Sequence, residues 1–129
     1  LRYTDVLMMY AECLNEEGYA ANGEAFNIIN KVRARAGLKA LTSADIPDQT
    51  SFRTAIQKER KVEFAFEGLR WFDLVRWGIA KKTIDAHFMT EDEGGGIYSM
   101  QDFRTIFAIP FDEISRYNND KVMWQNPGY

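Results

Sequence analysis

Apolar residues recur at helical spacing through the first part of the chain and predict two helices. The first stripe has four members, spaced i, i+4, i+7 and i+11: Tyr3, Leu7, Tyr10 and Leu14. The second runs along a helix over about 22–36 and also has four members: Ala25, Ile29, Val32 and Ala36. Gly18 and Gly37 follow these helices, and glycine suits the left-handed position that ends a helix. Two helices joined by a short connection predict an antiparallel helical hairpin.

A third helix is predicted after a loop over 38–50 that contains Pro47, and it begins near Ser51 or Phe52. It leads into 59–78, ERKVEFAFEGLRWFDLVRWG, where two tryptophans and three phenylalanines alternate with eight charged residues. Gly68 interrupts this segment. Either it lets a second backbone approach closely, or it divides 52–77 into two helices.

A helical projection of 59–78 places most charges in one arc and most rings opposite. The rings of Phe66 and Trp77 interrupt the charged arc, which predicts that this side is covered as well. Charges three residues apart predict the pairs Glu67–Arg70, Arg70–Asp73 and Asp73–Arg76. The interpretation is a structural charge cluster with five members: Glu63, Glu67, Arg70, Asp73 and Arg76.

Helical periodicity weakens beyond Gly78, and the three glycines at 94–96 predict a flexible turn. The sequence RTIFAIP at 104–110 predicts a short strand or extended segment that ends at Pro110. A brief helix is predicted over 111–116, and the final QNPGY is typical of turns.

Composition fits one compact globular domain or subdomain over residues 1–129, with 46% hydrophobic and 27% charged residues. The net charge of −3 argues against a nucleic-acid partner, and no apolar run is long enough to span a bilayer. Cys13 is the single cysteine, lies within a helical pattern and is predicted to be a small buried residue. The apolar pattern is already running at residue 1, so we expect a fragment of a longer protein.

Catalytic and metal sites are weakly supported. Glu59, Glu63 and Glu67 stand four apart on one helical face, but arginines within reach favour ionised, structural carboxylates. His87 is interpreted as an exposed loop histidine, and one histidine and one cysteine make no zinc site. The acidic run at 91–93 lacks the spacing of a calcium loop and is interpreted as a solvated turn. No nucleotide or cofactor fingerprint is present, so we expect neither cofactor nor metal.

Three aromatic residues outside the strong helical patterns are candidates for stacking on sugar rings: Phe88, Tyr98 and Trp124. The flat face of an aromatic ring suits the apolar C–H patches of a sugar. Packing is the more common role of such rings, so both interpretations stay open for these three.

Five segments, in order, resemble those of SusD/RagB-type outer-membrane lipoproteins: LRYTDVLMMYAECLNE, INKVRARAGL, ERKVEFAFEGLRWFDLVRWG, IFAIPFDEI and QNPGY. The resemblance covers nearly all 129 residues and is to the C-terminal part of such a protein. It implies an all-α fold of helical hairpins similar to tetratricopeptide repeats, with a long loop and minor extended segments near the C-terminus.

The resemblance also implies a function: capture of a nutrient, usually a glycan, at the surface of Bacteroidota cells. The implied partner is a SusC-like TonB-dependent transporter. The implied location is the outer membrane, reached through an N-terminal lipid anchor that this fragment does not contain, and Cys13 lacks the lipobox of such an anchor. In this family the sugar-binding rings lie largely upstream, so the fragment is interpreted mainly as scaffold without enzymatic activity. Two alternatives remain: a helical scaffold that binds only protein, and a glycoside hydrolase that uses two helix glutamates.

Overall fold

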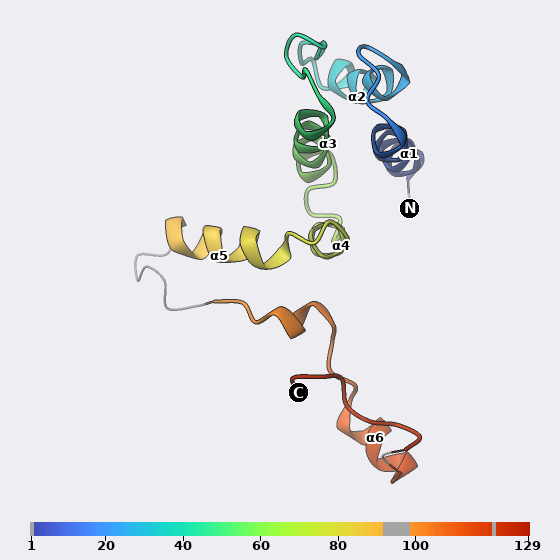
Figure 1. Ribbon diagram of the computed structural model, residues 1–129, viewed down its shortest axis with the longest axis vertical. Helices are drawn as coiled ribbons and strands as arrows, with labels where there is room; N and C mark the ends of the chain where they lie inside the picture. The colour runs from blue at the N-terminus through green and yellow to red at the C-terminus, as the bar shows by residue number, and fades with distance from the viewer. Residues whose placement is uncertain (1, 92–98, 120) are drawn as a thin grey trace. The chain divides into compact units, whose positions relative to one another are not determined.

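A computed structural model describes residues 2–91, 99–119 and 121–129, and every regular element among them is helical (Figure 1). In chain order these elements are α1 (Tyr3–Glu17), α2 (Glu24–Arg35), α3 (Gln49–Glu63), α4 (Arg70–Arg76), α5 (Ala80–Glu91), the 3₁₀ helix η1 (Asp102–Thr105) and α6 (Phe111–Tyr117). The chain divides into two compact units, Leu1–Arg70 and Trp71–Tyr129. The predicted all-α class is confirmed.

In the unit Leu1–Arg70, α1 packs against both α2 and α3 around one apolar core. Its buried members are Met8, Ala11, Phe26, Ile28, Ile29, Val32, Ile46, Phe52, Ile56 and Phe64. Three aromatic rings contact one another in a row. The ring centroids are 6.0 Å apart for Tyr19 and Phe26 and 5.0 Å apart for Phe26 and Phe52. These tilted and edge-on contacts tie the α1–α2 connection to α3.

The buried face of α1 differs from the predicted stripe. Tyr3 is 77% exposed and Tyr10 44% exposed, whereas the residues that α1 buries are Asp5, Met8, Ala11 and Asn15. Periodicity of apolar residues missed this face because two of its members are polar and find their partners in α3. The prediction for Cys13 was also wrong: its thiol is free and exposed, on the opposite side of the helix.

Helix ends follow local backbone chemistry. Gly37 has φ +72° and ends α2 as predicted, with the Leu38 N–H donating to the Arg33 carbonyl at 2.9 Å. Gly18 has φ 167°, so the predicted left-handed end of α1 was wrong and the backbone there is extended. α3 begins two residues earlier than predicted because Asp48 caps it: its carboxylate accepts the Ser51 N–H at 2.8 Å, and its own N–H donates to the Ser51 hydroxyl.

The helical segment predicted over 52–77 is interrupted between α3 and α4. Of the two alternatives for Gly68, the structure therefore favours division into two helices. Residues 64–69 form turns in which Phe66 and Gly68 have φ values of 65° and 75°. A Cβ added at Gly68 would meet nothing within 4 Å, so the left-handed backbone, not a close approach, favours glycine. The Phe66 ring is fully exposed in this structure, so the predicted cover on that side was wrong for this residue.

The unit Trp71–Tyr129 contains α5, a helix that the weak periodicity after Gly78 did not predict. His87 and Phe88 therefore lie on a helix instead of a loop. Among the described residues of this unit, Leu74, Ala80 and Met100 form a small buried core, and partly buried apolar side chains pack against it. α6 lies where a brief helix was predicted and ends at Asn118, which has φ 41°.

The extended segment predicted over 104–110 is shorter in the structure: Arg104 and Thr105 belong to η1, where the prediction was wrong, and the non-helical part begins at Ile106, whose backbone is extended. Within the described residues, 106–110 pairs with side chains instead of a strand. The Gln125 amide accepts the Ile109 N–H at 2.8 Å and donates to the Ile109 carbonyl at 2.9 Å. Asn126 donates to the Phe107 carbonyl at 2.7 Å, and the Tyr129 hydroxyl to the Ile106 carbonyl at 2.8 Å. The terminal QNPGY thus satisfies the backbone groups of this segment.

Candidate functional site

A buried ion pair joins α1 to α3. The Arg60 guanidinium lies 2.8 Å from the Asp5 carboxylate, and the two side chains are 3% and 7% exposed. Glu12 provides a second carboxylate at 3.5 Å. Charges so far from water need partners, so this arrangement fixes how the two helices pack.

Arginines also occupy the carboxylates that sequence reasoning considered for catalysis. Glu63 binds Arg2 at 3.2 Å and Arg35 at 2.5 Å, and Glu67 binds Arg2 at 2.6 Å. Glu59 forms an ion pair with Arg33. The arginines come from α2 and from the residue before α1, so these carboxylates connect elements of the unit.

The predicted charge cluster is divided between the two units of the chain. Glu63 and Glu67 belong to Leu1–Arg70, where Arg2 also stacks on the Phe64 ring with 4.9 Å between the guanidinium carbon and the ring centroid. In Trp71–Tyr129 the predicted pair Asp73–Arg76 is present at 2.9 Å, with Asp73 buried. The contacts of Glu63 and Glu67 join separate elements of their unit, whereas the Asp73–Arg76 pair lies within α4.

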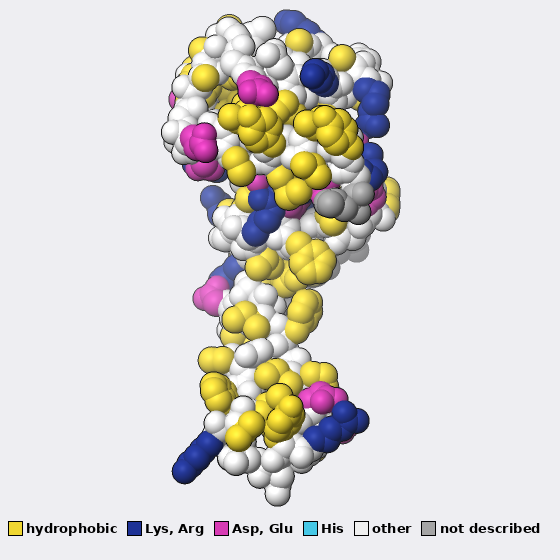
Figure 2. Space-filling model, turned by 90° about the vertical axis from the view of Figure 1, so that its right-hand side faces the viewer, with side chains coloured by type: hydrophobic (Ala, Val, Ile, Leu, Met, Phe, Trp, Pro, Cys, Tyr) yellow, Lys and Arg dark blue, Asp and Glu magenta, His cyan; other side chains and the backbone are white. Residues whose placement is uncertain are grey.

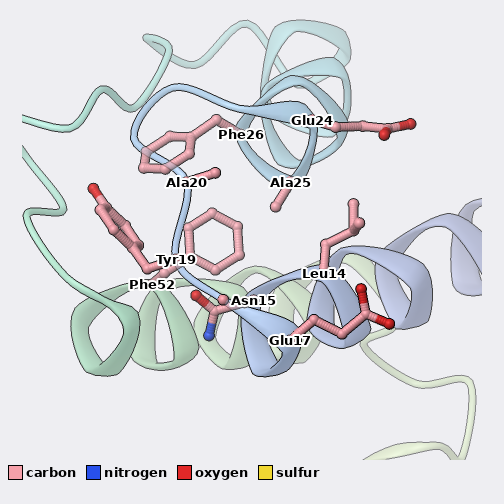
Figure 3. A pocket seen from close by; sticks show the side chains of 10 residues that line it. Leu14, Asn15, Glu17, Tyr19, Ala20, Glu24, Ala25, Phe26 and Phe52 are labelled. Carbon is pink, nitrogen blue, oxygen red and sulfur yellow. The ribbon is translucent and has the colours of Figure 1, made fainter.

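A cleft of about 340 Å³ opens between the end of α1, the start of α2 and the start of α3 (Figure 3). Phe26 and Phe52 line its apolar side, and Glu17 and Glu24 extend from α1 and α2 on the other side. The Tyr10 hydroxyl donates to Glu24 at 3.4 Å, and the nearby negative charge of Glu24 raises the pKa of Tyr10. The cleft offers hydrogen-bond acceptors beside apolar surface. Sequence reasoning missed it, since its walls come from three helices.

A larger hollow, of about 550 Å³, lies in the unit Trp71–Tyr129. It is lined by Trp71, Ile84, Met100, Arg104, Phe107 and Tyr129. The ring centroids of Trp71 and Phe107 are 6.4 Å apart, and Arg104 is the one charged residue among the described residues of the lining. Nothing in the spacing of these residues predicted the hollow, because η1 and the extended segment bring them together.

Phe88 and Trp124, two of the three predicted stacking rings, do not line this hollow or the cleft. Phe88 is half-buried on α5, with its ring 5.7 Å from that of His87 and edge-on to it. Trp124 is 64% exposed in the segment after α6. Tyr98 lies outside the described residues. A sugar-binding role for these rings stays a prediction.

The described residues contain no cluster of metal ligands and no helix that could span a membrane. Among them, no three His, Cys, Asp or Glu side chains gather as metal ligands would. Asp92 and Glu93 of the predicted acidic turn lie outside the described part of the chain, as do the three glycines after them. None of the described helices has the length and apolar character needed to cross a membrane.

Comparison with known proteins decides the family. The family model of the SusD family matches residues 1–129. The chain belongs to the SusD family. SusD-like protein P2 of Formosa agariphila is 31% identical to it over 134 residues, a match that covers all of this SusD-family chain and 25% of the relative. SusD-like protein P25 of the same organism is 50% identical over 80 residues, covering 60% of the chain and 15% of the relative.

Solved structures agree. A SusD homolog from Bacteroides thetaiotaomicron superposes with a TM-score of 0.80 at 40% sequence identity, over the whole chain and 26% of that structure. The chain spans about a quarter of the length of SusD-like protein P2 and of the solved Bacteroides thetaiotaomicron homolog. The predicted family and its helical fold are therefore confirmed.

Proposed function

We propose that this chain is part of a cell-surface glycan-binding protein of the SusD family that serves polysaccharide uptake in Bacteroidota. Its partner in this proposal is a SusC-like TonB-dependent transporter of the outer membrane, and a lipid anchor outside residues 1–129 holds it there. Membership of the SusD family over residues 1–129 is the observation that carries the proposal.

Within that protein, residues 1–129 act mainly as a scaffolding subdomain. Many of their charged side chains link separate elements: Arg60 joins α3 to Asp5 of α1, and Arg2, before α1, binds Glu67 in the turns after α3. Side chains engaged in this way hold the fold and are poorly available to a ligand. The glycan-binding side chains then lie mainly in the rest of the polypeptide.

The proposed protein binds its ligand without cleaving it. A glycoside hydrolase needs one carboxyl group kept protonated as the acid and a second as base or nucleophile. Glu59, Glu63 and Glu67 each form an ion pair with an arginine, so all three carboxylates are already engaged in contacts within the fold. This arrangement suits structure better than proton transfer.

Affinity gel electrophoresis through a panel of plant, host and microbial polysaccharides tests the proposal. The full-length protein should be slowed by at least one polymer, without release of reducing ends. A protein carrying only residues 1–129 should migrate as in the gel without polysaccharide. If no polymer slows the full-length protein, the glycan proposal fails. If the short protein is slowed as well, the scaffold assignment fails instead.

A further inference from the structure

The unit Trp71–Tyr129 has a small apolar core for its size. Among its described residues the buried apolar side chains are Leu74, Ala80 and Met100, compared with ten in the core of Leu1–Arg70. Hydrophobic burial is the main favourable contribution to folding, so a core of this size stabilises little chain. Additional apolar contact is needed to hold the segment after α5 in place.

The same unit exposes many large apolar side chains, and Figure 2 shows hydrophobic side chains at the surface. Those more than half exposed in its last part are Ile106, Phe107, Phe111, Tyr117, Val122 and Trp124. Soluble monomers rarely leave large contiguous apolar surface in water, and such surface normally marks a contact with another molecule or segment.

A sugar ligand and a segment of the same polypeptide differ in how long each would cover this apolar surface. A captured sugar must leave again for transport, so it cannot supply the contacts that keep this unit folded between captures. A segment of the same polypeptide is always present and at high effective concentration. The chain spans about a quarter of the length of its relatives, which leaves ample polypeptide for that role.

We propose that the hollow lined by Trp71, Phe107 and Tyr129 is the permanent seat of an apolar stretch of the same polypeptide that lies outside residues 1–129. This inference rests on the proposal above that the chain is part of a longer SusD-family protein. The sugar-binding surface is then elsewhere, and the hollow serves to join this unit to the remainder of the fold.

Charge defines the occupant further. Arg104 stands at the hollow beside the Phe103 ring, with 6.0 Å from its guanidinium carbon to the ring centroid. Arg104 is exposed at the rim of the hollow, and within the described part of the chain it forms no ion pair with a carboxylate. The occupant that fits carries aliphatic or aromatic side chains for the rings and an Asp or Glu beside them for Arg104.

Photo-crosslinking in the full-length protein tests the inference. The variant Phe107→p-benzoylphenylalanine is irradiated as a purified monomer without polysaccharide or transporter, and the captured peptide is identified by mass spectrometry. The expected product is an intramolecular crosslink to an apolar, acid-containing peptide outside residues 1–129. Should this variant fail to fold, Arg104→p-benzoylphenylalanine probes the same hollow from an exposed position.

Other products overturn the inference. Capture of a peptide from 2–70 places the cover within the chain itself, a crosslinked dimer indicates a second copy, and a crosslink that requires polysaccharide makes the hollow a sugar site. Absence of any crosslink at both positions leaves the hollow open to water and equally contradicts the inference.

A charge reversal tests the occupant's acidic residue. Arg104→Glu should lower the thermal midpoint of the full-length protein by several degrees, whereas the exposed control Lys121→Glu should change it by less than about one degree. Equal thermal midpoints for the two variants would show that the occupant places no Asp or Glu beside Arg104. Affinity gels on the same samples report sugar binding separately, so the inference and the proposed function can fail independently.

Discussion

The Gln125 side chain binds both backbone groups of Ile109, accepting its N–H at 2.8 Å and donating to its carbonyl at 2.9 Å. A primary amide presents one donor and one acceptor side by side, which is how a neighbouring β-strand would pair with the same residue. The extended segment 106–110 therefore needs no strand partner among the described residues. This contact gives a structural reason for the motifs IFAIP and QNPGY to occur in one chain.

Replacing Gln125 should loosen the last part of the chain. Gln125→Ala leaves two backbone groups of Ile109 without their partner and is expected to lower the free energy of unfolding by about 1–3 kcal/mol. Urea unfolding followed by tryptophan fluorescence reports on this unit, because Trp71, Trp77 and Trp124 all lie in it. Gln101→Ala, at an exposed position of the same unit, is the matched control and should change stability by less than about 0.5 kcal/mol. Equal effects of the two variants would contradict the role of the amide.

Gly128 should tolerate a side chain less well than Gly68. Both have positive φ, 96° and 75°, so alanine strains the backbone at each position by about 1–2 kcal/mol. At Gly128 an added Cβ would also lie 2.4 Å from the Phe103 ring, whereas at Gly68 it meets nothing within 4 Å. Gly128→Ala is thus expected to be the more destabilising variant in thermal unfolding. A greater loss for Gly68→Ala would show that the ring moves aside freely.

Breaking the ion pair between Arg60 and Asp5 should be costly. Asp5→Ala leaves a buried guanidinium with Glu12 as its carboxylate partner at 3.5 Å, and we expect a loss of about 3–5 kcal/mol in unfolding free energy. The exposed pair Arg116–Glu113 is the control, and Glu113→Ala should cost less than about 1 kcal/mol. Chemical denaturation followed by circular dichroism measures both, and similar losses would mean that burial of Arg60 is unimportant.

Sequence reasoning succeeded where local chemistry decides the structure and failed where tertiary contacts do. Gly37 ended α2 as predicted, and the short helix after Pro110 formed where Pro110 stops the extended segment. The buried face of α1 could not be read from apolar spacing, since Asp5 and Asn15 are buried through contacts with α3. The hollow in Trp71–Tyr129 could not be predicted from apolar spacing either. Its lining residues come from elements far apart in sequence and therefore follow no local period.

The stability of the unit Trp71–Tyr129 should depend on pH through Asp85. Its carboxylate accepts the Met100 N–H at 2.7 Å and contacts Lys81 at 3.0 Å, and these two partners, the N–H first, lower the pKa of Asp85. A group with a depressed folded pKa stabilises the fold above its unfolded pKa and loses this effect as pH falls through the folded value. We therefore expect unfolding to become easier below about pH 4.

The variant Asp85→Asn isolates this contribution. An amide cannot ionise, so the variant should be less stable near neutral pH and should lose less stability than the wild type on acidification. Thermal midpoints measured between pH 7 and pH 3 give the dependence of stability on pH for the wild type and for Asp85→Asn. Parallel curves for the two proteins would assign the acid sensitivity of this unit to other carboxylates.

Glu63 distinguishes a structural carboxylate from a catalytic one. Its side chain is 8% exposed and receives contacts from both Arg2 and Arg35, so glutamine would remove the charge through which α3 binds these two arginines. Glu63→Gln should therefore lower the thermal midpoint, whereas Glu17→Gln at the edge of the α1–α2 cleft should leave it nearly unchanged. In the full-length protein, affinity gels should show the same polysaccharide retardation for wild type and Glu63→Gln at temperatures where both are folded. If instead wild-type protein releases reducing ends and Glu63→Gln does not, Glu63 is a catalytic residue and the scaffold assignment of these helices is wrong.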